Sequence, residues 1–289
     1  MMLLIPSEVY KKLGGMKLLS KSKIRGQHKG SHRSSRYGSS MDFSDYRAYH
    51  IGDDVRQIDW NVYARSEKYY IKRFLDEQEM RVQIVLDGTK SMAGEAKWLL
   101  AKQLTAALGH VVLQHDDRCI CSLITDQEVV PFRKKGGIYK QRFSSTVQNF
   151  PEPAMKTSFV DGALRNLSKG QTVLIIITDA LEPIDKLEQL IGRLPKYAGD
   201  VRLIQVMEES EVRPSFTGDV ELMDIETERL VNVSMTGSVL TKYEQVKAQH
   251  EQQLAYLCAK YGVAHIQVIA EEGLQQALFH RLRKANWIQ

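Results

Sequence analysis

The sequence of 289 residues contains few cysteines and no long apolar run. Its three cysteines are too scattered for a disulfide scaffold, so we expect a reducing compartment. No apolar run approaches the roughly 18 residues that a membrane-spanning helix needs. The apolar residues Met1 to Ile5 end at Pro6, follow no basic residue and are too few for a signal peptide. The sequence therefore predicts a soluble, cytoplasmic protein.

The balance of residue types excludes general disorder. Hydrophobic residues make up 43% and charged residues 26% of the chain, which is typical of a globular protein with a sizeable core. At roughly 150 residues per domain, the length suits one large domain or two modest ones.

The net charge of +5 is unevenly spread, because the segment from Ser20 to Gly38 contains no acidic residue. Its basic residues are Lys21, Lys23, Arg25, Lys29, Arg33 and Arg36. Such a block suggests binding to nucleic acid or another anionic surface, which would depend steeply on salt. The alternative is a solvated, flexible basic loop. The segment has almost no aromatic residues on which single-stranded bases could stack.

The chain divides near residue 75 into a basic N-terminal region (1–74) and an α/β domain (75–289). The first region contains a helix candidate at 7–19, the basic Gly/Ser-rich loop and a polar segment. Strands are predicted at 81–86, 118–125, 128–132, 172–178, 201–207 and 264–269, and helices at 96–113, 158–167, 184–194, 240–261 and 274–282. This alternation predicts a Rossmann-type, doubly wound and mostly parallel sheet flanked by helices. A small β excursion near 219–233 interrupts it.

Two predicted strands end in aspartate. Asp87 follows Leu86, and Asp179 follows Thr178. In a doubly wound sheet the functional crevice lies beyond the carboxyl ends of the strands. We therefore expect both carboxylates on one rim of the sheet.

Hydroxyl groups accompany the first of these aspartates. Thr89 and Ser91 follow Asp87 by two and four residues, and Thr157 begins a later helix candidate. Mg²⁺ prefers octahedral coordination by oxygen, so these groups and Asp179 are candidate metal ligands. Two aspartates neutralise the dication, and an open coordination position then favours a carboxylate from a partner. The alternative is a helix N-cap at Asp87 and Thr89 without metal.

The segment from Asp87 to Ser91 resembles the DxSxS signature of von Willebrand factor A domains, with Thr89 in place of the usual first serine. The metal-ion-dependent adhesion site of these domains also uses a threonine and a second aspartate from later loops. The resemblance implies a von Willebrand A-like fold and a site for Mg²⁺ or Mn²⁺. The implied ligands are Asp87, Thr89, Ser91, Thr157 and Asp179, with Ser158 as a rival to Thr157.

A longer resemblance lies upstream, where the residues from Gly38 to Tyr49 lead into the segments GDDVRQIDW (52–60) and AR (64–65). This pattern resembles the bacterial family called domain of unknown function 58, whose members place a GDD-R-IDW-AR segment before a von Willebrand A-like domain. Ile51 replaces the usual proline and Asp42 the usual glutamate. Downstream, the segment 222–228 resembles the family's short acidic hairpin.

The resemblance covers most of the chain from about residue 20 onward. It implies a non-enzymatic, metal-dependent protein-binding module that acts as an adaptor or chaperone-like partner of a MoxR-type AAA ATPase and its clients.

Within the upstream segment, Asp53, Asp54, Arg56, Asp59 and Arg65 alternate in sign. One interpretation is an ion network in which arginines satisfy the carboxylates and lock the segment onto the sheet edge. The other is a recognition surface or a second metal site with the three aspartates as ligands. Their spacing favours neither.

A competing hypothesis is a phosphohydrolase, because the segment from Leu86 to Thr89 is similar to the DxDGT motif of haloacid-dehalogenase-like enzymes. If Asp87 is the second aspartate of that motif, the nucleophile position is Val85, which cannot attack phosphorus. If Asp87 is the nucleophile, Thr89 replaces the acid/base aspartate. The chain also lacks a GxxxxGK[ST] loop for ATP hydrolysis. These features favour a protein that is not an enzyme.

Overall fold

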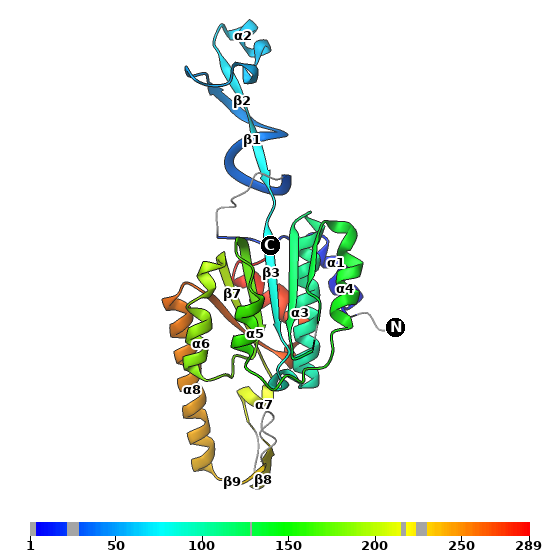
Figure 1. Cartoon of the computed structure of the whole chain (residues 1–289), viewed down its shortest axis with the longest axis vertical. Coiled ribbons are helices and arrows are strands. Elements are labelled where there is room, and N and C mark those ends of the chain that lie inside the picture. The colour runs from blue at the N-terminus through cyan, green and yellow to red at the C-terminus, as the bar shows by residue number, and fades with distance from the viewer. Residues whose placement is uncertain (1–3, 22–28, 128, 215–217, 224–229) are drawn as a thin grey trace. The chain divides into compact units, whose positions relative to one another are not determined.

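The computed structural model describes residues 4–21, 29–127, 129–214, 218–223 and 230–289, with the backbone alone for 29–45, 72–78, 222–223, 231 and 235 (Figure 1). The chain forms two compact units. Residues 1–22 and 81–289 make up one, which we call the α/β unit, and residues 23–80 make up the other, the hairpin unit. The boundary predicted near residue 75 falls within a strand of the hairpin unit.

The strands of the α/β unit are β3 (Arg81–Asp87), β4 (Arg118–Ile124), β5 (Phe132–Lys135), β6 (Gln171–Thr178), β7 (Ala198–Met207), β8 (Gly218–Met223), β9 (Leu230–Met235) and β10 (Ala264–Ile269). Its α-helices are α1 (Ser7–Leu13), α3 (Glu95–Gln114), α4 (Lys140–Gln148), α5 (Phe159–Asn166), α6 (Ile184–Ile191), α7 (Glu209–Val212), α8 (Gly237–Lys260) and α9 (Gly273–Gln276). Short helical turns are η2 (Lys90–Met92), η3 (Gly137–Tyr139), η4 (Leu194–Lys196), η5 (Ala270–Glu272) and the π-helical η6 (Ala277–Leu282).

The central sheet pairs its strands in the order β10-β7-β6-β3-β4-β5. All these pairings are parallel except that of the edge strand β5 with β4. From β3 the chain adds strands first toward β5 and then, beginning with β6, toward β10. The order therefore reverses between β3 and β6, which defines a doubly wound sheet. The predicted fold class, a von Willebrand A-like α/β sheet flanked by helices, is confirmed.

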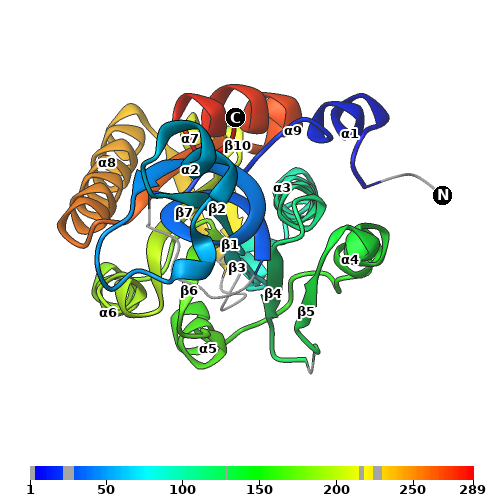
Figure 2. The ribbon, with the colours of Figure 1, turned by 90° about the horizontal axis from the view of Figure 1, so that it is seen from above.

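Helices cover both faces of this sheet, as Figure 2 shows: α3 and α9 lie on one face, and α5, α6 and α8 on the other. Strand β6 is buried along its whole length, as the apolar run from Val173 to Ile177 predicts for a central strand. Cys119 and Cys121 are buried free thiols of β4 and belong to the core.

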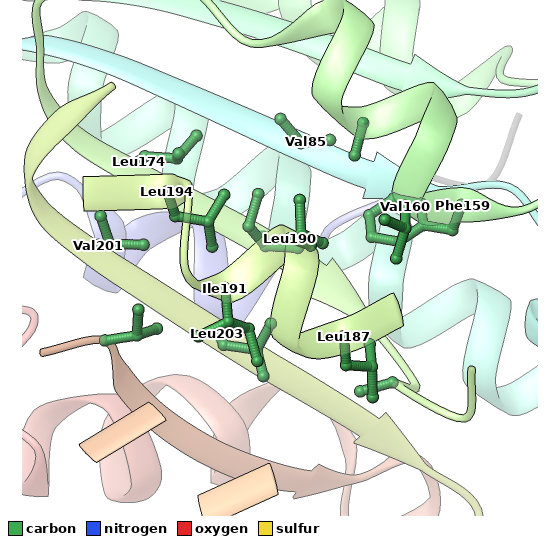
Figure 3. Packing of buried hydrophobic residues seen from close by; sticks show 14 of the residues in the cluster. Val85, Phe159, Val160, Leu174, Leu187, Leu190, Ile191, Leu194, Val201 and Leu203 are labelled. Carbon is green, nitrogen blue, oxygen red and sulfur yellow. The ribbon is translucent and has the colours of Figure 1, made fainter. Parts of the chain in front are cut away.

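The core between the sheet and α5, α6 and α8 positions the ends of the strands. Leu187, Leu190 and Ile191 of α6 belong to one buried cluster with Leu174 and Leu203 of the strands, and Figure 3 shows Ile191 beside Leu203. All of them are nearly inaccessible to solvent. Burying such a side chain stabilises the fold by about 1.5–3 kcal/mol, so this face holds β3, β6 and β7 firmly in register.

Several predicted boundaries are wrong. Helix α1 ends at Leu13 instead of residue 19, because Gly14 and Gly15 follow it. Strand β5 occupies Phe132–Lys135 rather than residues 128–132, since Pro131 cannot donate a hydrogen bond to a strand. Helix α4 was not predicted, because its sequence is mostly polar. The predicted excursion near 219–233 is confirmed as the antiparallel hairpin β8–β9.

In the hairpin unit, β1 (Lys29–Ala48) pairs antiparallel with β2 (Tyr70–Gln78), and η1 (Val55–Gln57) and α2 (Trp60–Ser66) lie between them in the chain. The prediction of a loop in the basic segment is therefore wrong from Lys29 onward, where the backbone forms β1. Its Gly/Ser-rich composition disfavours a strand, but part of its backbone pairs with β2 in a ladder that several register shifts interrupt. Apart from Lys21, whose backbone N–H donates to Asp200, the side chains of the basic block lie outside the described residues.

No helix within the described residues has the length and apolar character needed to cross a membrane.

A buried histidine gives the α/β unit a pH-dependent stability. His110 of α3 packs its ring 4.7 Å from that of Tyr10 of α1. Burial, with a smaller effect of the charge of Lys140, lowers the pKa of His110 from 6.5 to about 4. The unfolded chain thus takes up this proton at a higher pH than the folded protein does, so stability is lost as the pH falls from 6.5 toward 4.

We predict that His110→Gln removes this loss. Between pH 7 and pH 4.5, the unfolding free energy of the variant should fall by about 2 kcal/mol less than that of the wild type. Urea unfolding at the two pH values measures the difference, and His280→Gln, at an exposed position, is the control. An identical pH dependence for wild type and His110→Gln would contradict the prediction.

Candidate functional site

The candidate site lies where β3 and β6 end. These neighbouring strands are parallel, and Leu86 pairs with Ile177 at their carboxyl ends. The next residues are therefore adjacent: the Thr178 hydroxyl donates a hydrogen bond of 2.6 Å to Asp87 Oδ2. Asp179 follows directly. The structure thus brings Asp87 and Asp179 to one rim, at the point where the strand order reverses.

The loop after β3 places the Thr89 hydroxyl on Asp87 and the Ser91 hydroxyl on Thr89. Thr89 donates to Asp87 Oδ1 from its backbone N–H (2.8 Å) and from its hydroxyl (2.7 Å). Ser91 Oγ lies 3.0 Å from Thr89 Oγ1. Backbone hydrogen bonds hold the loop in place, from Gly88 N–H to Ile124 O and from Lys90 N–H to Met155 O. Three side chains of the predicted ligand set therefore form one oxygen-rich cluster.

Asp179 has a different set of partners. Its Oδ1 accepts a hydrogen bond from Leu181 N–H, and its Oδ2 lies 3.4 Å from Lys97 Nζ. Lys97 also lies 2.6 Å from Glu211 Oε1 of α7 and donates to Ser91 O. Burial alone would lower the pKa of Lys97, but the charges of Asp179 and Glu211 outweigh it and raise the pKa. A charged ammonium group is therefore part of the rim, which sequence reasoning did not reveal.

The electrostatics of the rim oppose a second negative charge. Asp87 is 1% exposed. Burial, followed by the nearby charge of Asp179, raises the pKa of Asp87 from 3.8 to about 7, although hydrogen bonds from Thr178 and Thr89 act in the opposite direction. A cation between the two carboxylates would favour the charged form of both.

Thr157 and Ser158 are not part of this cluster in the structure. The Thr157 hydroxyl donates to Asp126 Oδ1 (2.8 Å), and the Ser158 hydroxyl donates to Glu182 Oε2 (2.7 Å). Asp126 and Glu182 follow β4 and β6 on the same edge of the sheet. Their position after predicted strands is the signal that could have indicated them.

The oxygen chemistry of the rim fits Mg²⁺. Asp87, Asp179, Thr89 and Ser91 supply carboxylate and hydroxyl oxygens, the ligand types that this ion prefers. Within the part of the chain that the structure describes, no group of three or more His, Cys, Asp or Glu residues is placed to hold a metal. A metal at this rim would therefore depend on two carboxylates together with hydroxyls.

The acidic residues of the hairpin unit have local roles. Asp53 pairs with Arg47 at 2.7 Å. Asp54 accepts from Arg56 N–H at the start of η1, and Asp59 accepts from the first turn of α2 and from the Tyr46 hydroxyl. Asp53 thus has an arginine partner, as the ion-network interpretation expects, whereas the contacts described for Asp54 and Asp59 are with backbone N–H groups and a tyrosine hydroxyl.

Beside the rim lies a cavity of about 240 Å³. Its wall includes Leu181, Gln205, Met207, Glu211, Tyr243, Val246, Lys247, His250 and Glu251. Leu181, Tyr243 and Val246 are exposed to solvent by 46%, 43% and 59%. Exposed apolar side chains next to a polar site are typical of a surface that contacts another protein.

The strand order gives the α/β unit the fold of a von Willebrand A-like domain. The chain belongs to the family described as Protein of unknown function DUF58, whose sequence pattern matches residues 45–253. The family membership predicted from the segment around Gly52 to Arg65 is confirmed.

Among curated proteins, the uncharacterized proteins Rv1480 of Mycobacterium tuberculosis and Mb1516 of Mycobacterium bovis are each 26% identical to this chain over 208 residues. The match covers 68% of this chain and 64% of each relative, so the chain spans less than two thirds of their length.

Solved structures show weaker similarity. The hypothetical protein BatB of Bacteroides thetaiotaomicron is 14% identical with a TM-score of 0.39, and covers 71% of this chain and 98% of its own. The SpRpn10 VWA domain is 11% identical with a TM-score of 0.39. The match covers 70% of this chain and 94% of that domain's chain. The fold class follows from the strand order and not from these similarities.

The loop after β3 requires glycine at position 88. A Cβ atom there would lie 2.5 Å from the backbone oxygen of Ile124, which cannot move aside as a side-chain end can. We predict that Gly88→Ala lowers the unfolding free energy by about 1–3 kcal/mol. Gly15→Ala, with no atom within 4 Å of the added methyl group, is the control. Equal denaturation midpoints for the two variants would show that the loop is not packed as described.

Proposed function

We propose that the α/β unit is a protein-binding module in which Asp87, Thr89, Ser91 and Asp179 hold Mg²⁺ or Mn²⁺. A carboxylate of a protein partner then completes the coordination of the ion. Thr157 is the further ligand that the resemblance implies, and joining the ion would require it to leave Asp126. The bound ion would supply positive charge to bridge two acidic groups that otherwise repel each other.

The observation that supports this proposal most strongly is the burial of two aspartates side by side. Such a pair is costly without a compensating cation. Lys97 contacts Asp179. The described partners of Asp87 are the neutral groups of Thr89 and Thr178. Asp87 is thus the carboxylate that gains most from a metal ion.

The surroundings favour binding over catalysis. Val85, the nucleophile position in one phosphohydrolase interpretation, is an apolar residue of the buried core. Around the rim, Leu181 and Val246 expose apolar surface beside polar groups, as protein contact surfaces do.

We further propose that the partner is a MoxR-type AAA ATPase, for which this chain acts as an adaptor or chaperone-like factor toward client proteins. This part of the proposal comes from the family resemblance. The rim suggests how such a partner would bind, because an open coordination position on the metal would accept a carboxylate of the partner.

The proposal predicts that Mg²⁺ stabilises the protein through Asp87. At ten times its dissociation constant, the ion should add about 1.4 kcal/mol to the unfolding free energy and raise the melting temperature by a few degrees. Asp87→Asn should abolish this increase, whereas Asp185→Asn, at an exposed position of α6, should retain it. Thermal unfolding with and without Mg²⁺ measures the effect, and an unchanged response of Asp87→Asn would refute the metal site.

Partner binding is tested at constant Mg²⁺, because an AAA ATPase itself needs the ion for its nucleotide. A co-expressed MoxR-type ATPase should be retained by immobilised wild type and by Asp185→Asn, and at least tenfold less by Asp87→Asn. Equal retention by all three proteins would exclude a metal bridge to this partner.

A further inference from the structure

Lys97 is a buried cation in the middle of the candidate rim. It lies in the first turn of α3, and its side chain is only 2% exposed. Lysine is rarely buried unless its charge is paired. Here Nζ donates to Ser91 O at 3.1 Å and lies 3.4 Å from Asp179 Oδ2 and 2.6 Å from Glu211 Oε1. The three N–H groups of the ammonium thus meet three oxygens from different parts of the chain.

Two of these oxygens belong to residues of the proposed metal site, Asp179 and Ser91. Ser91 contributes its carbonyl oxygen to Lys97 and its hydroxyl to the cluster at Asp87. Asp179 is the second carboxylate of the rim. A metal ion at Asp179 would therefore lie close to the Lys97 ammonium, because both would contact the same carboxylate. The two positive charges would repel each other strongly in this buried site.

The third oxygen gives the ammonium an alternative position. Glu211 lies closer to Lys97 than Asp179 does, and its side chain is 25% exposed. Its other carboxylate oxygen accepts the Glu208 N–H in a capping box at the start of α7. The Tyr243 hydroxyl of α8 donates to its backbone oxygen. Glu211 is thus an anion held by its own hydrogen bonds, and it lies closer to the ammonium than Asp179 does.

We propose that Lys97 is a tethered cation that competes with the metal ion for Asp179, and that Glu211 sets the affinity of the site by drawing the ammonium away. This inference rests on the proposed metal site. When the ammonium pairs with Asp179, cation binding is weakened. When it pairs with Glu211, Asp179 is free to act as a ligand.

Linkage makes the effect reciprocal: a metal ion at Asp179 strengthens the pairing of Lys97 with Glu211. Glu211 also lines the cavity beside the rim, and α7 leads from β7 toward the hairpin β8–β9. Figure 1 shows α7 and this hairpin beyond the carboxyl end of the sheet. The cation site is therefore coupled to the surface with which a partner would make contact.

The test is the affinity of the full chain for Mn²⁺ alone, measured by electron paramagnetic resonance of the free ion. Lys97→Met should bind Mn²⁺ on the order of tenfold more tightly than the wild type, because a positive charge next to the ion is removed. Glu211→Gln should bind several-fold more weakly. Lys102→Met removes a charge from the same helix, where the lysine pairs with Glu152, and should leave the affinity unchanged.

The double variant Lys97→Met/Glu211→Gln shows whether Glu211 changes the Mn²⁺ affinity through Lys97 or directly. If Glu211 acts through the ammonium, the effect of Glu211→Gln should shrink markedly in the Lys97→Met background. Lys97→Met alone leaves two carboxylates without their cation, so it is the variant most at risk of failing to fold. The double variant removes the charges of Lys97 and Glu211 together, and its affinity should then equal or exceed that of the wild type.

Each result has a definite meaning. Tighter binding by Lys97→Met, or Mn²⁺ binding that appears only in that variant, supports competition. If folded Lys97→Met binds Mn²⁺ no more tightly than the wild type, the role of Lys97 is overturned. If, in addition, Asp87→Asn loses the binding that the wild type shows, the metal site itself is retained. Failure of the wild type, Lys97→Met and the double variant to bind Mn²⁺ overturns the metal site and the competition together.

Discussion

The parallel pairing of β3 with β6 is the constraint on which the candidate site depends. The ladder that matches Leu86 with Ile177 leaves Asp87 next to Thr178, and a hydrogen bond of 2.6 Å joins the two side chains. Apolar side chains on both faces of the sheet fix this register. A shift of one residue would turn Asp87 to the other face of the sheet. The core thus determines where the acidic residues of the rim meet.

Two buried carboxylates close together repel each other, and the structure compensates only part of their negative charge. Lys97 forms ion pairs with Asp179 and Glu211, whereas Asp87 accepts hydrogen bonds from hydroxyl and backbone N–H groups. Burial, followed by the nearby charge of Asp179, raises the pKa of Asp87 to about 7. An acidic pair with one internal cation and nearby hydroxyls suits a site that takes up a further cation under control.

The sequence predicts the sheet and the rim because both follow from local patterns. A buried strand is an apolar run, and an aspartate after it marks the edge of the sheet. Lys97 was missed because a lysine in a helix usually faces solvent, and nothing local indicates that Asp179 and Glu211 meet it. The loop prediction for Lys29 onward failed because a strand ladder overrode composition. Thr157 remains a predicted ligand, although its hydroxyl is hydrogen-bonded to Asp126.

The most direct measurement is the anomalous scattering of Mn²⁺ in crystals of the full chain. The central claim is that Asp87 and Asp179 act on the same cation. It predicts an anomalous peak at the carboxyl ends of β3 and β6, within coordination distance of both carboxylates and of the hydroxyls of Thr89 and Ser91. Fully ordered side chains at this rim with no peak, or with manganese bound elsewhere, would contradict it.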